Sequence, residues 1–278
     1  MTQPLKISTF KDISAFILET LQKHYAAGIE IKYVKNADEA HQDLINEKAD
    51  IVFMSYDDTL SIYFEESFKD IRAFMPIHGG ILDLCGNIDL ELNQVNIGID
   101  TDSGYARALR TYLKQALNTH DYQQLKWLKA GATNIRYEKL SNQELDATLL
   151  NPPFSVMPNI KRLANLYTQM GAYQGLVGNC RQSWLTENKD RLNRFMNLYH
   201  QQLNSIQTES ENTIQQLENF YQLSNEIAQK VYARLLQPDG LHFSSEFNEM
   251  ALTATENIFY NEVNVTNIPK KRIWVLSL

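Results

Sequence analysis

Apolar residues in the first part of the chain follow two alternating spacings. Short apolar runs predict strands, and the segments after the first two runs carry apolar residues three and four positions apart, as in an amphipathic helix. The predicted strands are Leu5–Phe10, Ile29–Tyr33 and Ile51–Met54. Helix-capping residues follow the first two strands, namely Asp12, and then Asn36 with Glu39. This β-α-β-α-β order predicts a parallel sheet with right-handed crossovers.

A second unit of the same kind follows the polar segment 86–93. Its helix is predicted to begin after the loop Asp100–Gly104 and to bury Tyr105, Leu109, Tyr112, Leu113 and Ala116. The other predictions here are strands at Ile71–Ile77, Ile81–Cys85, Val95–Ile99, Ile135–Leu140 and Ala147–Leu150, and a capping box at Ser141 and Glu144. The segment Asn151-Pro152-Pro153 ends the last strand, because proline has no N–H to donate to a sheet. Two successive α/β units are most simply two lobes.

From Trp184 onward the pattern changes to helices, with apolar residues three and four positions apart. The predicted helices are Glu187–Ile206, Glu211–Leu223, Asn225–Leu236 and Ser245–Tyr260. No internal repeat of solenoid period interrupts them. The chain is therefore predicted to be α/β with a helical C-terminal segment.

The composition excludes several classes of protein. Of 278 residues, 44% are hydrophobic and 21% are charged, which is typical of a globular chain and not of a disordered one. The 33 acidic and 26 basic residues give a net charge of −7, so we expect no nucleic-acid partner, because that binding depends on Lys and Arg. No apolar run approaches the roughly 20 residues that cross a bilayer. Cys85 and Cys180 are expected to be free thiols, and a disulfide across the hinge is the less favoured alternative.

Motifs for common catalytic and metal chemistry are missing. The six histidines, His24 among them, are scattered without metal-ligand spacing, and no Cys-x-x-Cys occurs. There is no Walker loop, no G-x-G-x-x-G and no G-x-S-x-G. We therefore predict no metal or cofactor, and favour a binding protein over an enzyme. The first ten residues lack the pattern of a secretory leader. The protein is thus cytoplasmic as written, or periplasmic or on the cell surface if a leader has been removed.

The loops after the predicted strands are rich in hydroxyls, glycines and aromatic rings. In open parallel sheets, ligands bind beyond the carboxyl ends of the strands, where such loops meet. The candidate ligand-binding residues are Phe10, Ser55, Tyr56, Asp57, His78, Thr101, Asp102, Ser103, Gly104, Tyr105, Asn151 and Phe154. Four of them could sandwich a flat ring: Phe10, Tyr56, Tyr105 and Phe154. For Tyr105, packing in the core is an equally good interpretation.

The loop Thr101–Tyr105 has two interpretations. A strand, a small-residue loop and a helix N-terminus together can hold an anion without Lys or Arg. Alternatively, Ser103 or Asp102 is an ordinary helix cap, which is the favoured interpretation of the motif alone. The carboxylate of Asp102 would repel an anion unless Arg107 or Arg110 offsets it.

Several segments, in a fixed order along the chain, carry a family resemblance. They are Ala49–Phe53, His78-Gly79-Gly80, Val95–Ile99 with Ser103-Gly104, Leu145–Pro153, and Ser183–Asn188, where Lys189 follows in place of the usual proline. This order resembles the periplasmic-binding-protein type 2 fold. Within it, the sequence is similar to the nitrate, sulfonate and taurine family of ABC-transporter solute receptors, which includes receptors for thiamine-pyrimidine precursors.

The resemblance implies two lobes with a ligand cleft between them and hinge closure around the ligand. Residues 1–85 and 174–278 would form the first lobe, with the C-terminal helices packed on it, and residues 86–173 the second. By position, the cleft would be lined by Ser55, Tyr56, Asp57, His78, Thr101, Ser103, Gly104 and Asn151. The acidic Asp57 and Asp102 disfavour nitrate or a simple sulfonate, and favour a ligand with hydrogen-bond donors or a ring cation.

The leading hypothesis is an ABC-transporter substrate-binding protein, acting as a monomer, that delivers a small organic solute to a permease. The solute would be a pyrimidine thiamine precursor or a sulfonate-like compound. The first alternative is a cytoplasmic enzyme on the same scaffold. A thiamine-pyrimidine synthase is disfavoured because Cys85 and Cys180 stand alone, whereas a dehydratase-like lyase, similar to the chorismate-consuming enzymes of an alternative menaquinone pathway, could use His78 or Asp57 as acid or base. The second alternative is a cytoplasmic ligand sensor.

Overall fold

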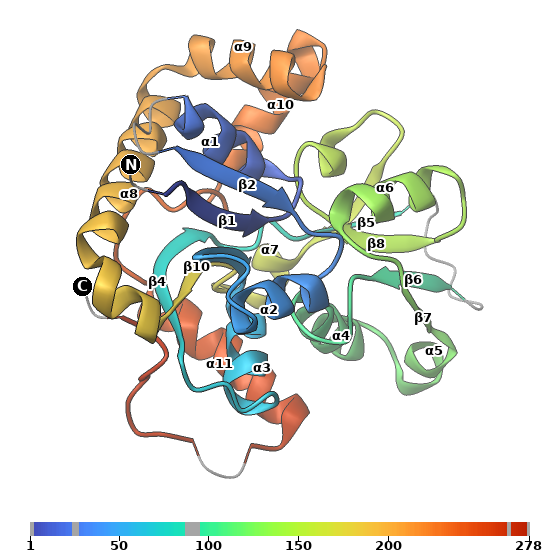
Figure 1. The fold of residues 1–278 in the computed structure, drawn as a ribbon. Helices are drawn as coiled ribbons and strands as arrows, with labels where there is room; N and C mark the ends of the chain where they lie inside the picture. The colour runs from blue at the N-terminus through green and yellow to red at the C-terminus, as the bar shows by residue number, and fades with distance from the viewer. Residues whose placement is uncertain (1–2, 24–27, 87–94, 266–267, 277–278) are drawn as a thin grey trace.

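The polypeptide folds into two lobes, each built on a five-stranded sheet (Figure 1). The computed structural model describes residues 3–23, 28–86, 95–265 and 268–276. The strand order is β2-β1-β3-β10-β4 in the first sheet and β7-β6-β8-β5-β9 in the second. The α/β class and the two-lobed architecture predicted from the sequence are confirmed. Residue 24, one of the six histidines, and most of the polar segment 86–93 lie outside the described residues.

The first lobe begins with the predicted β-α-β-α-β unit, and its first three strands are parallel. Asp12 and Asn36 cap the two helices: each accepts a hydrogen bond at 2.9 Å, from the amides of Ser14 and Glu39 respectively. β10 then lies antiparallel between β3 and β4. The elements are β1 (Leu5–Thr9), α1 (Ile13–Gln22), β2 (Ile29–Tyr33), α2 (Ala37–Ile45), β3 (Ile51–Ser55), α3 (Tyr56–Phe64), β4 (Ile71–His78) and β10 (Leu176–Arg181).

The second lobe repeats this plan, with β6 parallel to β7 and β8. Its elements are β5 (Asp83–Gly86), β6 (Asn96–Ile99), α4 (Tyr105–Ala116), α5 (Thr119–Gln124), β7 (Lys126–Lys129), α6 (Thr133–Ser141), β8 (Ala147–Leu150), β9 (Lys161–Asn165) and α7 (Leu166–Met170). β5 pairs with β8 and β9 and not with the first sheet. We therefore place Asp83–Cys85 in the second lobe, although the sequence-based limits put them at the end of the first.

Local predictions around α6 are wrong. Ile135–Leu140 is helical, because the buried side chains of Arg136 and Leu140 are four residues apart, which is the spacing of a helix face. Ser141 ends α6 and does not form a capping box with Glu144. The strand in this part of the sheet is β7, whose side chains are mostly exposed and so give no apolar signal. On α4, Leu109 and Leu113 are buried as predicted, whereas Tyr105 and Tyr112 are half-buried and Ala116 is exposed.

Two segments connect the lobes, one between β4 and β5 and one between α7 and β10. They lie against each other where Gly80 meets Gly175. A Cβ on Gly175 would lie 2.1 Å from the amide nitrogen of Gly80, so a side chain at this position would force the two connections apart. Glycine here allows the connections to run side by side between the lobes.

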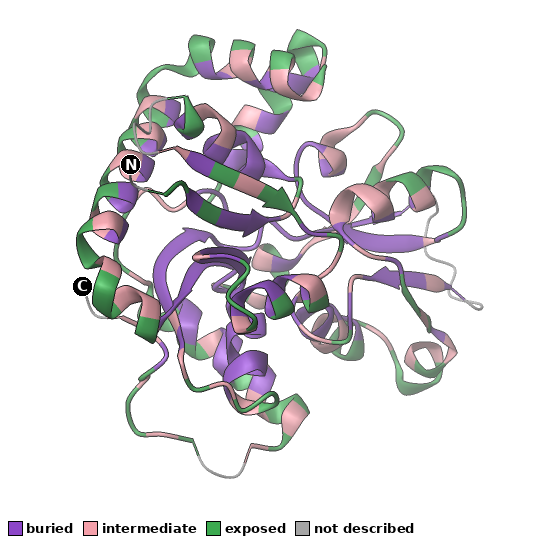
Figure 2. Ribbon diagram, in the orientation of Figure 1, coloured by how far each residue is buried: buried purple, intermediate pink, exposed green. Residues whose placement is uncertain are grey.

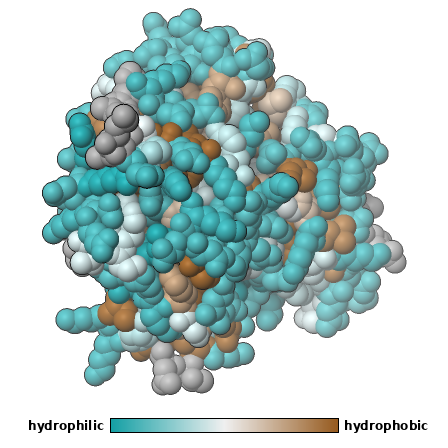
Figure 3. Space-filling model, in the orientation of Figure 1, coloured by the Kyte–Doolittle hydropathy of each residue, from teal (hydrophilic) through white to brown (hydrophobic). Residues whose placement is uncertain are grey.

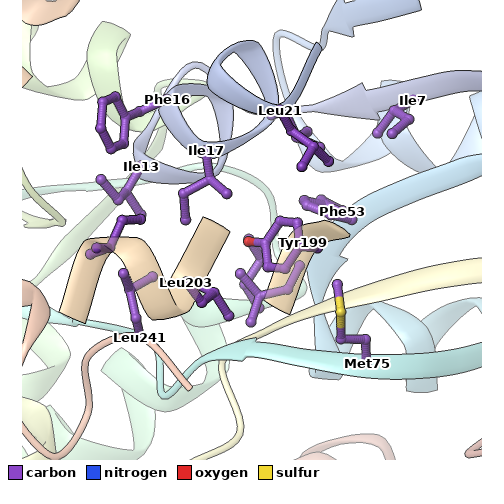
Figure 4. Close-up of a cluster of buried hydrophobic side chains, with 14 of the residues drawn as sticks. Ile7, Ile13, Phe16, Ile17, Leu21, Phe53, Met75, Tyr199, Leu203 and Leu241 are labelled. Atoms are coloured by element: carbon purple, nitrogen blue, oxygen red, sulfur yellow. The ribbon is translucent and has the colours of Figure 1, made fainter. Parts of the chain in front are cut away.

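The C-terminal helices return to the first lobe, as predicted (Figure 1). They are α8 (Gln182–Thr208), α9 (Ser210–Tyr221), α10 (Asn225–Leu235) and α11 (Glu249–Val263). Tyr199 and Leu203 of α8 pack beneath α1 and β3, where the rings of Tyr199 and Phe53 lie 5.8 Å apart (Figure 4). α11 contacts both α3 of the first lobe and α4 of the second, so the C-terminal segment also supports the contact between the lobes.

Burial follows this layering. β3 and β10 are buried along their whole length, whereas the outer faces of α8 and α9 are exposed (Figure 2). On the face drawn in Figure 3, apolar side chains of the described residues gather only in small separate patches. Within the described ranges, no helix combines the length and the apolar character that a membrane span requires. Cys85 and Cys180 are buried free thiols, as expected.

Candidate functional site

A small, partly open cavity lies between the two lobes and has a volume of about 50 Å³. A buried water needs roughly 10–15 Å³ measured in this way, so the cavity has room for one compact solute. The first lobe contributes Phe10, Asp12, Ala37, Ser55, Asp58 and Leu176. The second contributes Gly98–Thr101, Ser103–Ala106, Leu109, Ala132, Thr133, Arg136, Leu149 and Asn151. The polar side chains therefore come from loops and helix starts of both lobes.

The start of α4 is bound by a carboxylate from the opposite lobe. The backbone N–H of Gly104 donates a 2.9 Å hydrogen bond to Oδ1 of Asp57, in the first turn of α3. Nη1 of Arg107 donates to the same oxygen at 2.5 Å, and its guanidinium also binds Ser61 of α3 and Glu65, the residue that follows α3. Burial raises the pKa of Asp57 to about 7, although the charge of Arg107 acts in the opposite direction.

Asp58 lies beside the cavity in a dense hydrogen-bond network. Its carboxylate accepts from the hydroxyls of Ser55, at 2.7 Å, and Ser103, at 2.9 Å. His41 lies 3.4 Å from the same carboxylate and also binds Glu66. Burial opposes ionisation of Asp58, but the contacts with His41, Ser55 and Ser103 together outweigh it and hold the pKa of Asp58 below its usual value. The same contacts overcome burial at His41 and raise its pKa to about 10, so this pair is ionic.

Three side chains around the cavity have a buried oxygen that makes no hydrogen bond with the protein and could accept one. These oxygens are Oδ1 of Asp100, the hydroxyl of Tyr105 and Oδ1 of Asn151. Burial raises the pKa of Asp100 to about 6, with the nearby charge of Arg136 acting to lower it. The guanidinium of Arg136 is turned to the backbone of Gly131 and Leu149, so its charge is held close to the cavity wall. These groups can accept hydrogen bonds from a small solute.

Solved structures with this architecture share little sequence with the chain. The ligand-binding component of an ABC-type import system from Staphylococcus aureus, with zinc bound, is 13% identical with a TM-score of 0.74, over 99% of this chain and 96% of that one. The alkanesulfonate-binding protein from Xanthomonas axonopodis pv. citri bound to MOPS is 15% identical with a TM-score of 0.73, over 95% of each chain. A Candida albicans protein described as exhibiting the generic periplasmic binding protein fold is 14% identical with a TM-score of 0.70, over 96% of this chain and 92% of that one.

The chain has the periplasmic-binding-protein fold. The resemblance found in the sequence is thereby confirmed at the level of the fold. No protein-family model and no curated protein sequence matches the chain.

Within this fold, seven of the predicted site residues line the cavity, and they are Phe10, Ser55, Thr101, Ser103, Gly104, Tyr105 and Asn151. The other five lie elsewhere. Asp57 is buried against α4, and Asp102 is exposed and paired with Lys129 at 2.6 Å. Phe154 packs on Tyr137 outside the cavity. The favoured interpretation of Ser103 or Asp102 as an ordinary helix cap is wrong, because neither side chain caps α4 and the N–H of Gly104 binds Asp57 instead.

His78 is buried in the connection between the lobes and does not line the cavity. Its Nδ1 accepts a hydrogen bond from the amide of Gly80 at 3.0 Å. Burial lowers the pKa of His78 to about 3, so the ring is neutral. In the part of the chain that the structure describes, no three His, Cys, Asp or Glu side chains are grouped to hold a metal ion.

Tyr56 is fully buried in the core of the first lobe and not beside the cavity. Its hydroxyl donates to Glu256 at 2.6 Å and accepts from the indole N–H of Trp274 at 2.7 Å. The sequence-based idea that Tyr56 stacks on a ligand is therefore wrong.

Replacing Tyr56 by phenylalanine is expected to lower the free energy of unfolding by about 1–3 kcal/mol, because Glu256 and Trp274 each lose a buried partner. Urea denaturation measures this, and Tyr33→Phe is the control, because the Tyr33 hydroxyl binds Glu19 at the surface. Wild-type stability in Tyr56→Phe would contradict the assignment.

The charged cavity residues were all absent from the predicted site: Asp12, Asp58, Asp100 and Arg136. Asp12 is the N-cap residue of α1, and Asp58 is hydrogen-bonded to Ser55, the N-cap residue of α3. A sequence shows such a capping role but not that the same side chain also lines a cavity. Arg136 was hidden because its segment was interpreted as a strand. Asp100 directly follows β6, so its position at a strand end was the available signal.

Proposed function

We propose that this protein is a solute-binding protein that encloses one small organic molecule between its lobes and presents it, as a monomer, to a membrane permease. The observation that carries the proposal is the set of buried, unpartnered oxygens of Asp100, Tyr105 and Asn151 in a cavity built from both lobes. Ligand sites of this kind combine apolar walls with a few placed polar groups. The Staphylococcus structure is described as the ligand-binding component of an import system, and the Xanthomonas structure as an alkanesulfonate-binding protein. Both support a binding role for the fold.

The chemistry of the cavity favours a solute that donates hydrogen bonds. A carboxylate, an amide oxygen and a hydroxyl can each accept one, and a second carboxylate, Asp58, lies in the same wall. Phe10 and Tyr105 add aromatic surface for a flat ring. An amino-substituted heteroaromatic ring, such as an aminopyrimidine, satisfies these groups, whereas a sulfonate would bring a negative charge close to the carboxylates of Asp58 and Asp100.

A thermal-shift screen tests the proposal with aminopyrimidines, alkylamines, alkanesulfonates and chorismate-like acids. At a concentration 100 times its Kd, a ligand stabilises the protein by about 2.7 kcal/mol, which is roughly 5 °C in melting temperature. We expect shifts with the amino-substituted rings only. Stabilisation by sulfonates alone would overturn the ligand class, and turnover of a stabilising compound, followed by chromatography, would overturn the binding-protein role.

The Asp100→Asn variant is expected to bind the stabilising compound at least about tenfold more weakly, because a hydrogen bond to a buried charge is lost. Asp102→Asn is the matched control, since that carboxylate is exposed and paired with Lys129. Calorimetric titration measures both. Equal affinities for the two variants would remove Asp100 from the site.

A further inference from the structure

The contact between α3 and α4 joins the two lobes through one carboxylate. Asp57 is fully buried, and its Oδ1 accepts from the N–H of Gly104, at 2.9 Å, and from Nη1 of Arg107, at 2.5 Å. Gly104 is the N-cap residue of α4, and it makes no side-chain cap of its own. The start of a helix in the second lobe is thus capped by a residue of the first.

Two independent features make this position attractive to an anion. The N-terminus of α4, a helix of 12 residues, carries partial positive charge. Arg107 adds a full positive charge, and its side chain is buried while reaching the same oxygen of Asp57. A guanidinium and a backbone amide thus converge on one carboxylate oxygen, as donors do in a charge-assisted anion site.

Gly104 allows the close approach that this contact needs. Its φ is +61°, in the left-handed region that favours glycine. A Cβ at this position would lie 3.0 Å from Oδ2 of Asp58 and 3.3 Å from Oγ of Ser55. The loop of the second lobe therefore reaches α3 only because residue 104 has no side chain.

We propose that the carboxylate of Asp57 takes the place of an anionic ligand in the anion site formed by Gly104 and Arg107. By occupying this site, Asp57 excludes free anions from it and joins the two lobes. The selection against anions rests on the function proposed above, because it concerns the same inter-lobe site. The occupation of the anion site by Asp57 stands on the contacts alone.

Arg107 faces three carboxylates, and Arg110 balances one of them. Glu65, the residue after α3, binds Nη2 of Arg107 at 2.8 Å, and Glu262 of α11 lies 3.9 Å from its Nε and 2.5 Å from Nη2 of Arg110. Asp57 and Glu65 therefore leave one anion in excess of what Arg107 balances. The remaining titratable groups facing the contact are Asp58 on α3, His41 on α2, which is paired with Asp58, and Tyr173 on the connection before β10. With several carboxylates around one guanidinium, a second free anion has no counter-charge there, whereas removal of Asp57 leaves a place for one small monoanion.

The Asp57→Gly variant with added formate tests this at pH 8. Small-angle scattering is expected to give a larger radius of gyration for Asp57→Gly than for the wild type, and formate is expected to restore the smaller value and raise the melting temperature. The wild type should respond to neither formate nor sulfate. The double variant Asp57→Gly/Arg107→Gln is the control, and its response to formate should be weaker by at least tenfold in concentration.

Absence of any formate response in folded Asp57→Gly, as judged by circular dichroism, would overturn the proposal. Calorimetric binding of formate or sulfate to the wild type, abolished by Arg107→Gln, would overturn it as well, and this second measurement needs no variant at position 57. Both use formate or sulfate and not the solute. A negative solute screen therefore bears on the proposed function alone, and a negative formate result on this inference alone.

Discussion

Replacing Arg234 by methionine is expected to lower the free energy of unfolding by about 3–5 kcal/mol, because it leaves two buried carboxylates without a counter-charge. Arg234 of α10 lies 3.0 Å from Asp83 of β5 and 2.6 Å from Asp239, and all three side chains are at most 5% exposed. Asn165 of β9 donates to the same two carboxylates, at 2.9 and 3.2 Å. This buried cluster ties the second sheet to the C-terminal helices of the first lobe.

Urea denaturation at pH 7.5 measures the effect, and Arg162→Met is the matched control. Arg162 lies 3.9 Å from the same Asp83, but its side chain is 54% exposed, so its removal should cost less than about 1 kcal/mol. If Arg234→Met cost no more than Arg162→Met, the buried cluster would contribute nothing to stability. A triple change of Arg234→Met, Asp83→Asn and Asp239→Asn should recover part of the loss, since no charge then remains buried.

The sequence was most informative about features that depend only on residues close together in the chain. The caps at Asp12 and Asn36 and the parallel pairing of the first three strands depend on nearby segments, and both were predicted. The position of β10 between β3 and β4 was not predicted. β10 follows β3 by more than 100 residues and runs antiparallel to it, and local periodicity cannot reveal such a distant pairing.

The site was predicted less completely, because its decisive contacts join distant residues. Asp57 and Gly104 are 47 positions apart, and the Tyr56 hydroxyl is bound from positions 256 and 274. An aromatic ring after a strand looks the same in a sequence whether it faces a cavity or the core. What separates Tyr56 from Tyr105 is the covering of α3 by α11 and Trp274, which no local pattern contains.

Asp57 and the Arg234 cluster are expected to differ in how far water reaches them when the lobes separate. Both are buried charges that bridge the lobes, but the Arg234 cluster lies next to the connections, whereas Asp57 binds the start of α4, whose following residues line the cavity. Separation of the lobes would expose Asp57 first to water and remove both of its donors. The ionisation of Asp57 is therefore expected to depend on whether the lobes are closed. The Arg234 cluster is expected to stay buried and to stabilise the contact between the lobes in either case.

The Asp57→Asn variant is expected to become more stable than the wild type as the pH rises from 5 to 8. Burial raises the pKa of Asp57 from 3.8 to about 7, so the native state holds a proton that the unfolded state has released. This contribution to stability is fully present below about pH 4 and is lost as the pH rises through 7. A change of this size in pKa corresponds to roughly 4 kcal/mol. Asparagine stays neutral and keeps an oxygen for Gly104 and Arg107, so it avoids the loss.

Urea denaturation of both proteins at pH 5, 6.5 and 8 measures the difference between them. Other groups titrate in this range: Asp100, whose burial raises its pKa to about 6, acts in the same direction as Asp57. His78 and His242, whose burial lowers their pKa values to about 3 and 4, destabilise the native state as the pH falls below 6.5. These contributions are common to both proteins and cancel in the difference. The asparagine variant is expected to be more stable than the wild type by a margin that grows from pH 5 to pH 8, because the unfolded wild type releases its proton above about pH 4 whereas the native wild type does so only near pH 7. A less stable asparagine variant at pH 8 would instead mean that Arg107 and Gly104 stabilise the ionised carboxylate by more than burial costs it.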